Sequence, residues 1–173
     1  MTFSDRERII DLHAQKILDY YNHGVANFKS GNHHAAIADD DRTIALESSF
    51  AEAYHNRGLA KFELGDINGA ICDYTLALFL NPRFAKAYNN RGIAKSQLIN
   101  KLDEIADYDR AIALNPNLSE SYYNRGLAKS ELGDIFGAIA DYDVVLGLNP
   151  DDADAYCDRG VLQQTLGKTC SCC

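Results

Sequence analysis

Residues 51–84 read AEAYHNRGLAKFELGDINGAICDYTLALFLNPRF, and closely similar sequence returns along the chain every 34 residues. Three residue types keep this register: Tyr20, Tyr54, Tyr88, Tyr122 and Tyr156; Gly24, Gly58, Gly92, Gly126 and Gly160; and Pro82, Pro116 and Pro150. A period of about 20–50 residues indicates stacked units, because one such unit cannot bury its apolar face alone. The sequence therefore predicts a repeat architecture.

Each period contains the pattern of two helices. The first, over about 52–64, has apolar and small residues at i, i+3 and i+4, and it stops at Gly65, which suits the left-handed conformation of a helix C-cap. Asp66 is a suitable N-cap for a second helix over about 67–80. Pro82 ends this helix, because the residue before a proline is disfavoured in helical conformation. Each unit is thus predicted to be an antiparallel helical hairpin.

The chain resembles the tetratricopeptide repeat family in the pattern Tyr54-x2-Arg57-Gly58-x6-Gly65-Asp66-x3-Ala70-x3-Tyr74-x2-Ala77-x4-Pro82. The resemblance implies an all-α fold. More closely, it implies an α-solenoid of stacked antiparallel helix pairs, wound as a right-handed superhelix, with about four full repeats and one terminal helix.

The expected divisions follow the period: an N-terminal helical extension (1–16) continuous with the first repeat, repeats at 17–50, 51–84, 85–118 and 119–152, the first helix of a fifth repeat acting as a cap (153–167), and a Cys-rich tail (168–173). The first helix is expected to run from about residue 5 to residue 29. Repeat 1 is degenerate, with Asp40 where later repeats have tyrosine, as is typical of a terminal repeat.

Repeat 3 departs from the pattern at its turn. Ile99 stands where the neighbouring repeats have glycine, and a β-branched residue at positive φ is an outlier, so Asn100 could take that conformation instead. Glu104 stands where the second and fourth repeats have a close-contact alanine. We therefore expect the third hairpin to be splayed or its turn to be rebuilt.

Charge limits the classes of partner. The 173 residues include 17 Lys and Arg against 25 Asp and Glu, which gives a net charge of −8. Nucleic-acid binding needs a basic stripe that this composition does not favour, and an anionic membrane surface is disfavoured for the same reason. The longest apolar run, 76–80, is too short to span a membrane.

The termini and cysteines indicate a compartment. Residues 1–7 carry charges where a signal peptide needs an apolar stretch, so a cytoplasmic location is expected. The five cysteines are odd in number and three lie in the last four residues, which favours reduced thiols over a disulfide framework.

The resemblance also implies a concave groove lined by the first helix of each hairpin. The candidate peptide-binding residues that it maps onto this chain are Tyr21, Asn22, Asn56, Leu59, Asn90, Ile93, Tyr123, Asn124, Leu127 and Asp158. An asparagine at the same register in four repeats offers a donor and an acceptor that match a peptide unit. With helices about 8–10 Å apart and about 3.3 Å per extended residue, one asparagine would meet about every third peptide residue.

The acidic residues of this face predict the charge of the ligand. Its second half carries acids without a base: Glu120, Glu131, Asp154 and Asp158. A ligand with a basic end is one interpretation, and a solvated acidic surface is the other. A clamp for a C-terminal carboxylate, as in some receptors of this family, is not expected, because only Asn56 and Lys86 of its five positions fit.

Other constellations have structural interpretations. Periodic arginines (Arg57, Arg91, Arg125, Arg159) and aspartates (Asp39, Asp73, Asp107, Asp141) are expected to form ion pairs in the hairpin seams. His33 and His34 are adjacent and diverge on a helix, so no metal site is expected. Without a catalytic motif or a phosphate loop, neither enzyme activity nor a cofactor is predicted.

The sequence thus predicts a non-enzymatic scaffold or adaptor that binds an extended or helical peptide segment in its groove. The alternative is an assembly module that acts through its C-terminal edge, where Leu162 and Leu166 lack the cover of a following helix and could pair in a homodimer. For the tail, a lipidation signal, a soft-metal site, disulfides and the cut end of a longer array all remain open.

Overall fold

Nine α-helices and no strands make up the part of the chain that the computed structural model describes, residues 3–98 and 101–170. Their bounds are α1 Phe3–Lys29, α2 His33–Leu46, α3 Ala51–Glu63, α4 Ile67–Leu80, α5 Ala85–Ser96, α6 Lys101–Leu114, α7 Ser119–Glu131, α8 Ile135–Leu148 and α9 Ala153–Cys170. The predicted all-α class is confirmed, and α1 agrees with the helix expected from about residue 5 to residue 29.

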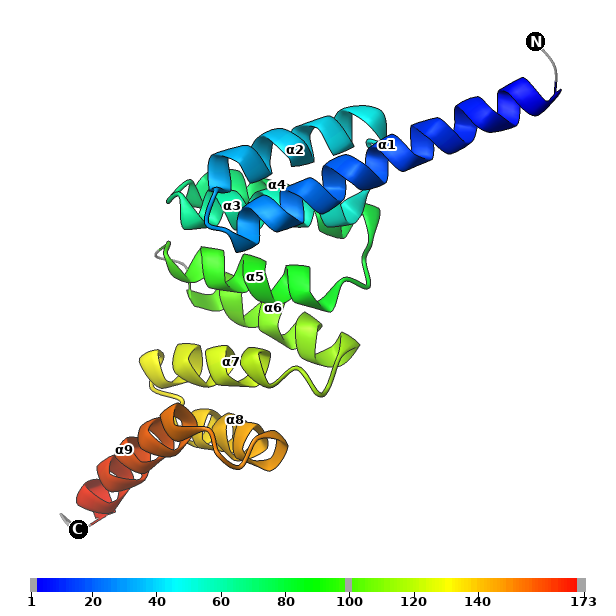
Figure 1. Cartoon of the computed structure of the whole chain (residues 1–173). Helices are drawn as coiled ribbons and strands as arrows, with labels where there is room; N and C mark the ends of the chain where they lie inside the picture. The colour runs from blue at the N-terminus through cyan, green and yellow to red at the C-terminus, as the bar shows by residue number, and fades with distance from the viewer. Residues whose placement is uncertain (1–2, 99–100, 171–173) are drawn as a thin grey trace. The chain divides into compact units, whose positions relative to one another are not determined.

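The helices belong to two compact units, Met1–Arg83 and Phe84–Cys173. In the first unit, α1 pairs with α2 and α3 with α4, and α2 packs on α3 (Figure 1). In the second unit, α5 pairs with α6 and α7 with α8, while α6 packs on α7 and α8 on α9. The prediction of stacked antiparallel helix pairs is confirmed in each unit.

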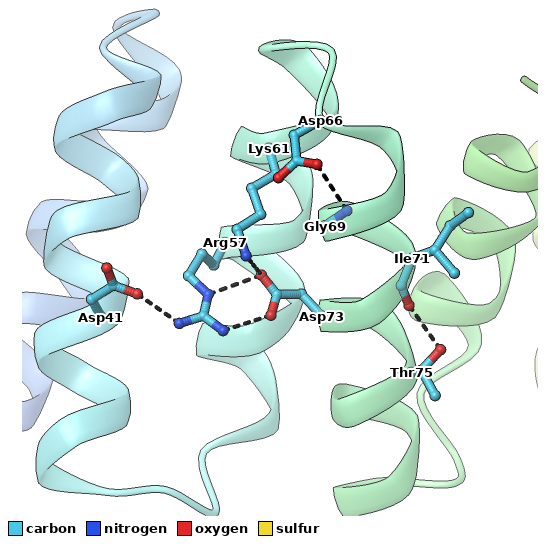
Figure 2. Close-up of polar contacts among 8 residues, drawn as sticks. All are labelled: Asp41, Arg57, Lys61, Asp66, Gly69, Ile71, Asp73 and Thr75. Atoms are coloured by element: carbon cyan, nitrogen blue, oxygen red, sulfur yellow. Dashed lines mark hydrogen bonds and ion pairs between the residues drawn. The ribbon is translucent and has the colours of Figure 1, made fainter.

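The tight turn inside a hairpin is formed by glycine and aspartate. Gly65 and Gly133 have φ values of +82° and +83°, in the left-handed region that glycine accepts at little cost. Directly after Gly65, the Asp66 carboxylate accepts a hydrogen bond of 3.0 Å from Gly69 N and so caps α4 (Figure 2). Asp134 caps α8 in the same way. Both assignments made from the sequence are confirmed.

The third hairpin is as closely packed as its neighbours, so the expectation that it is splayed was wrong. A Cβ added to Gly92 would lie 2.5 Å from Tyr108 Cε1, against 2.7 Å and 2.8 Å at the matching places of the second and fourth repeats. Glu104 is accommodated at 1% exposure without separating the helices. The turn residues Ile99 and Asn100 lie outside the described part of the chain.

A three-membered ion cluster holds each regular hairpin together (Figure 2). Arg57 donates from Nε and Nη2 to the two oxygens of Asp73, at 2.9 and 2.6 Å, and Lys61 Nζ lies 2.8 Å from the same carboxylate. Arg57 Nη1 also reaches Asp41 of the preceding helix, at 2.6 Å. The matching clusters are Arg91–Asp107–Lys95 and Arg125–Asp141–Lys129. The ion pairs expected in the hairpin seams are confirmed. The lysine that joins each cluster was not expected.

The aspartate of repeat 1 is held differently. Asp39 accepts hydrogen bonds from Asn27 and Arg42, at 2.9 and 2.8 Å. The reason is that repeat 1 has His23 in the place of the periodic arginine.

Two expectations about the C-terminal end are corrected. The last helix, α9, continues to Cys170, so residues 168–170 are helical rather than part of a tail. Leu162 is only 8% exposed, because Ala138 and Tyr142 of α8 cover it. Its packing is therefore complete without a following helix. Residues 171–173 lie outside the described part of the chain.

A buried carboxyl group replaces the repeat tyrosine in the first hairpin. Asp40 is fully buried, and neither of its oxygens has a hydrogen-bond partner among the described residues. Burial raises its pKa from 3.8 to about 8; Arg57 of α3 opposes this shift, whereas Asp39, Asp41 and Asp73 add to it. The folded chain therefore binds one more proton than the unfolded chain between about pH 4 and pH 8.

We therefore expect the free energy of unfolding of the first unit to fall as pH rises across this window, by about 1.4 kcal/mol per pH unit from Asp40 alone. Asp40→Asn should remove this contribution, because the amide does not titrate. Urea unfolding followed by circular dichroism at several pH values measures both slopes. Equal slopes for the wild type and the variant would contradict the assignment.

A second prediction concerns the ion clusters. Asp141→Asn should destabilise the second unit by about 3 kcal/mol, because Arg125 and Lys129 would remain partly buried without their carboxylate. The control is Asp143→Asn, which breaks the pair between Arg159 and an aspartate that is 53% exposed, and it should cost about 0–1 kcal/mol. Urea denaturation compares the two variants, and equal losses would show that the buried cluster is not decisive.

Candidate functional site

The predicted binding residues all lie on the first helices of the hairpins. Their helices are α1 for Tyr21 and Asn22, α3 for Asn56 and Leu59, α5 for Asn90 and Ile93, α7 for Tyr123, Asn124 and Leu127, and α9 for Asp158. Four of them therefore belong to the first unit and six to the second. The two sets are described separately below.

In the described part of the first unit, none of the predicted residues lines the cleft formed by residues 31–35 and Leu64. Tyr21 packs edge-on against Phe50, with ring centroids 5.0 Å apart, and Asn22 is exposed. Asn56 is half-buried, and its Nδ2 is a buried donor without a hydrogen-bond partner in the described part of the chain. Its Oδ1 lies 3.4 Å from His55 Nδ1. Asn56 thus has hydrogen-bonding capacity that its own chain does not use.

In the second unit two clefts adjoin, because Ile93 and Asn124 line both of them. The first has a volume of about 300 Å³ and is lined by Ile93, Ser119, Glu120, Tyr123, Asn124, Asp152 and Asp154. The second has a volume of about 260 Å³ and is lined by Ile93, Ser96, Gln97, Glu104, Tyr108, Asn124, Leu127, Ala128 and Glu131. Four of the predicted residues therefore surround one hollowed surface.

A buried polar layer joins α5 to α7 beside these clefts. Asn89 is 2% exposed, and its Oδ1 accepts hydrogen bonds from Ser121 Oγ at 2.9 Å and from Asn124 Nδ2 at 3.3 Å. Sequence reasoning missed Asn89 and Ser121. The available signal was a polar residue, Asn89, at the register that tyrosine or histidine occupies in the neighbouring repeats. Since an amide has two N–H groups and a carbonyl, Asn124 keeps capacity for a ligand.

Tyr123 connects α7 to α9. Its hydroxyl donates a hydrogen bond of 2.8 Å to Asp158 Oδ2. Burial and this hydrogen bond raise the pKa of Tyr123 above its ordinary value, so the hydroxyl stays protonated and the bond persists at neutral pH. Asp158 is therefore oriented by Tyr123, and its second oxygen remains available.

The clefts are negatively charged at their walls. Among the described residues, five acidic side chains line them and no lysine or arginine does: Glu120, Asp152 and Asp154 in the first, Glu104 and Glu131 in the second. Asp152 also caps α9 through a hydrogen bond of 3.0 Å from Ala155 N. Across the described residues, no group of three or more His, Cys, Asp or Glu side chains could hold a metal ion. Carboxylates, amides and an apolar floor suit an organic cation.

Stacked helical hairpins of this kind define a repeat scaffold, and comparison with known proteins gives the family. The model described as tetratricopeptide repeat matches residues 51–84 and 107–140. The chain is a tetratricopeptide-repeat protein. No curated protein shows significant sequence similarity to it. No helix among the described residues has the length and apolar character that crossing a membrane requires.

Several solved structures share the fold. The crystal structure of MamA is 25% identical, with a TM-score of 0.79, and the match covers 89% of this chain and 84% of that one. The first repeat domain of Spaghetti (RPAP3), bound to the HSP90 peptide SRMEEVD, is 28% identical with a TM-score of 0.66, covering 68% and 93%. The Arabidopsis OM64 domain is 27% identical with a TM-score of 0.65, covering 66% and 95%.

Proposed function

We propose that this protein is a non-enzymatic adaptor that holds an extended segment of a partner protein against the first helices of its hairpins. The fold is that of a protein-interaction scaffold. One observation carries the finer proposal: Ile93, Tyr123, Asn124 and Leu127, chosen by register alone, surround two adjoining clefts.

The asparagines supply the means of holding a peptide backbone. Asn124 has an unused N–H and a carbonyl oxygen, which together match the C=O and N–H of one peptide unit. Each such bond contributes about 0.5–1.5 kcal/mol net, and with partial apolar burial the expected affinity is micromolar.

The charge of the second unit favours a ligand with a basic end. The RPAP3 domain binds SRMEEVD, a peptide with three acidic residues. In this chain the clefts carry five carboxylates and no base, which would repel such a peptide and attract a basic one.

Peptide panning on the immobilised full chain, followed by calorimetry on the selected peptides, tests the proposal. Asn124→Ala should weaken binding roughly 2- to 10-fold, the value of one hydrogen bond, and Asn90→Ala with Asn124→Ala should weaken it further. The control Asn68→Ala removes an exposed amide from α4 and should leave the affinity unchanged. Unchanged binding by the double variant, at wild-type helicity, would contradict the proposal.

A second candidate function is assembly through α9. Tyr156 is 50% exposed on this helix, where Arg159 lies over its ring at 5.3 Å, and Val161 is exposed as well. A second copy of the chain could cover this surface and form a homodimer.

Sedimentation across micromolar concentrations tests the assembly. We expect a mass that rises with concentration in the wild type and that Tyr156→Glu returns to the monomer. The control Phe136→Glu changes an exposed aromatic residue of α8 and should have no effect. A monomer at all concentrations would refute this candidate.

A further inference from the structure

In the second unit the ion clusters hold basic side chains in the seams between helices, whereas acidic side chains line the clefts. Arg91 and Lys95 are both held by the buried Asp107, at 2.6 and 2.8 Å. The pair formed by Arg125 and Lys129 is held likewise by Asp141. These four bases of α5 and α7 point into the seams, so none of them lines a cleft on the same two helices.

The fifth base of these two helices, Lys86 of α5, belongs to neither lining, so no lysine or arginine lines the clefts among the described residues. The wall of the second cleft includes the buried Glu104, at a place where the second and fourth repeats have alanine. Glu131 contributes another carboxylate from α7. After burial, Glu104, Asp107 and Glu131 are the groups that raise the pKa of Tyr108, which agrees with a negative potential at this wall.

We propose that the two clefts each receive one basic side chain, lysine or arginine, of a single extended peptide whose backbone crosses Ile93 and Asn124 between them. This inference rests on the proposed function and specifies its ligand: a segment with two basic residues rather than one basic end. Glu120 and Asp154 bind one cation, and Glu131 binds the other, in the cleft whose wall includes the buried Glu104.

The size and lining of the clefts favour side chains over other cationic ligands. Volumes of about 300 and 260 Å³ lie at or below the lower end of small-molecule sites, about 300–1,000 Å³. Each cleft combines apolar surface (Ile93 with Tyr123, or Ile93 with Leu127) with carboxylates. Lysine and arginine need both, because an apolar stem carries their charged head.

The continuity of the clefts favours one ligand over two. Ile93 and Asn124 belong to both linings, so the two clefts adjoin at these residues. Asn124 lies where a peptide unit between the two basic residues would pass, and it can hydrogen-bond that unit. The surface therefore discriminates between peptides by the spacing of their two basic residues.

The test uses fluorescein-labelled peptides of about nine residues, which span about 30 Å when extended. Their background is alanine, serine and threonine, with both ends blocked. One series carries no arginine and one carries a single arginine. A third carries two arginines, which are neighbours in the first peptide and up to five residues apart in the last. Fluorescence anisotropy with the full chain measures each affinity at two salt concentrations.

We expect one separation to bind roughly tenfold more tightly than the single-arginine peptide, with a loss at high salt. Glu120→Gln with Asp154→Asn, and separately Glu131→Gln, should each reduce the two-arginine peptide to about single-arginine affinity. Asp151→Asn is the matched control for Glu131→Gln, since it also removes one negative charge, from an exposed residue in the loop before α9 that lines neither cleft. Glu131→Gln also avoids dependence on the buried Glu104, whose replacement could affect folding.

Several outcomes would overturn the proposal. One such outcome is an affinity that does not depend on the number or separation of the arginines. Another is an equal loss of peptide affinity in Asp151→Asn and in the cleft variants. Spermine that binds as tightly as the best peptide and displaces it would identify a free polyamine as the ligand. Neutral panned peptides that bind through Asn124 with no gain from arginine would refute only this inference and leave the proposed function standing.

Discussion

The buried carboxylate between an arginine and a lysine is the interaction on which each regular hairpin depends. Asp73 receives two bonds from Arg57 and one contact from Lys61, and the same cluster recurs in the third and fourth repeats. A buried charge is tolerated only when it is paired in this way. The cluster therefore fixes the register of the two helices, and the close approach of glycine to tyrosine can form only in that register.

The same clusters determine the character of the remaining surface. They hold six of the seven basic side chains of α3, α5 and α7 inside the seams, while the chain as a whole carries eight more acids than bases. The unit formed by α5–α9 thus presents carboxylates in its clefts. The electrostatics that stabilise the hairpins also set the charge of a partner.

Periodicity predicted much of the fold because each repeat obeys the same local rules. Gly65, Asp66 and the pairing of Arg57 with Asp73 all follow from position within 34 residues. Residues outside the pattern were harder. Lys61 stands where the family has an aromatic residue, so its role in the cluster was not foreseen, and Glu104 was judged by size alone.

The candidate site was predicted less completely, because it depends on side chains that meet from several helices. The family resemblance selected Ile93 and Asn124, and the sequence also placed Glu120, Glu131 and Asp154 on this face, but Glu104 of α6 and Asp152 before α9 were not expected there. The buried Asn89, which orients Asn124, is visible only once α5 and α7 are packed. The binding role of these residues stays a prediction.

Three buried acidic side chains meet the desolvation cost of burial in different ways. Asp73 is paired with Arg57 and Lys61, so it serves stability. Asp40 has no hydrogen-bond partner among the described residues, and burial raises its pKa to about 8, so it is mostly neutral at pH 7. Glu104 lies instead in the wall of a cleft, at 1% exposure. An acid that the repeat pattern does not require is best explained by what its position can bind.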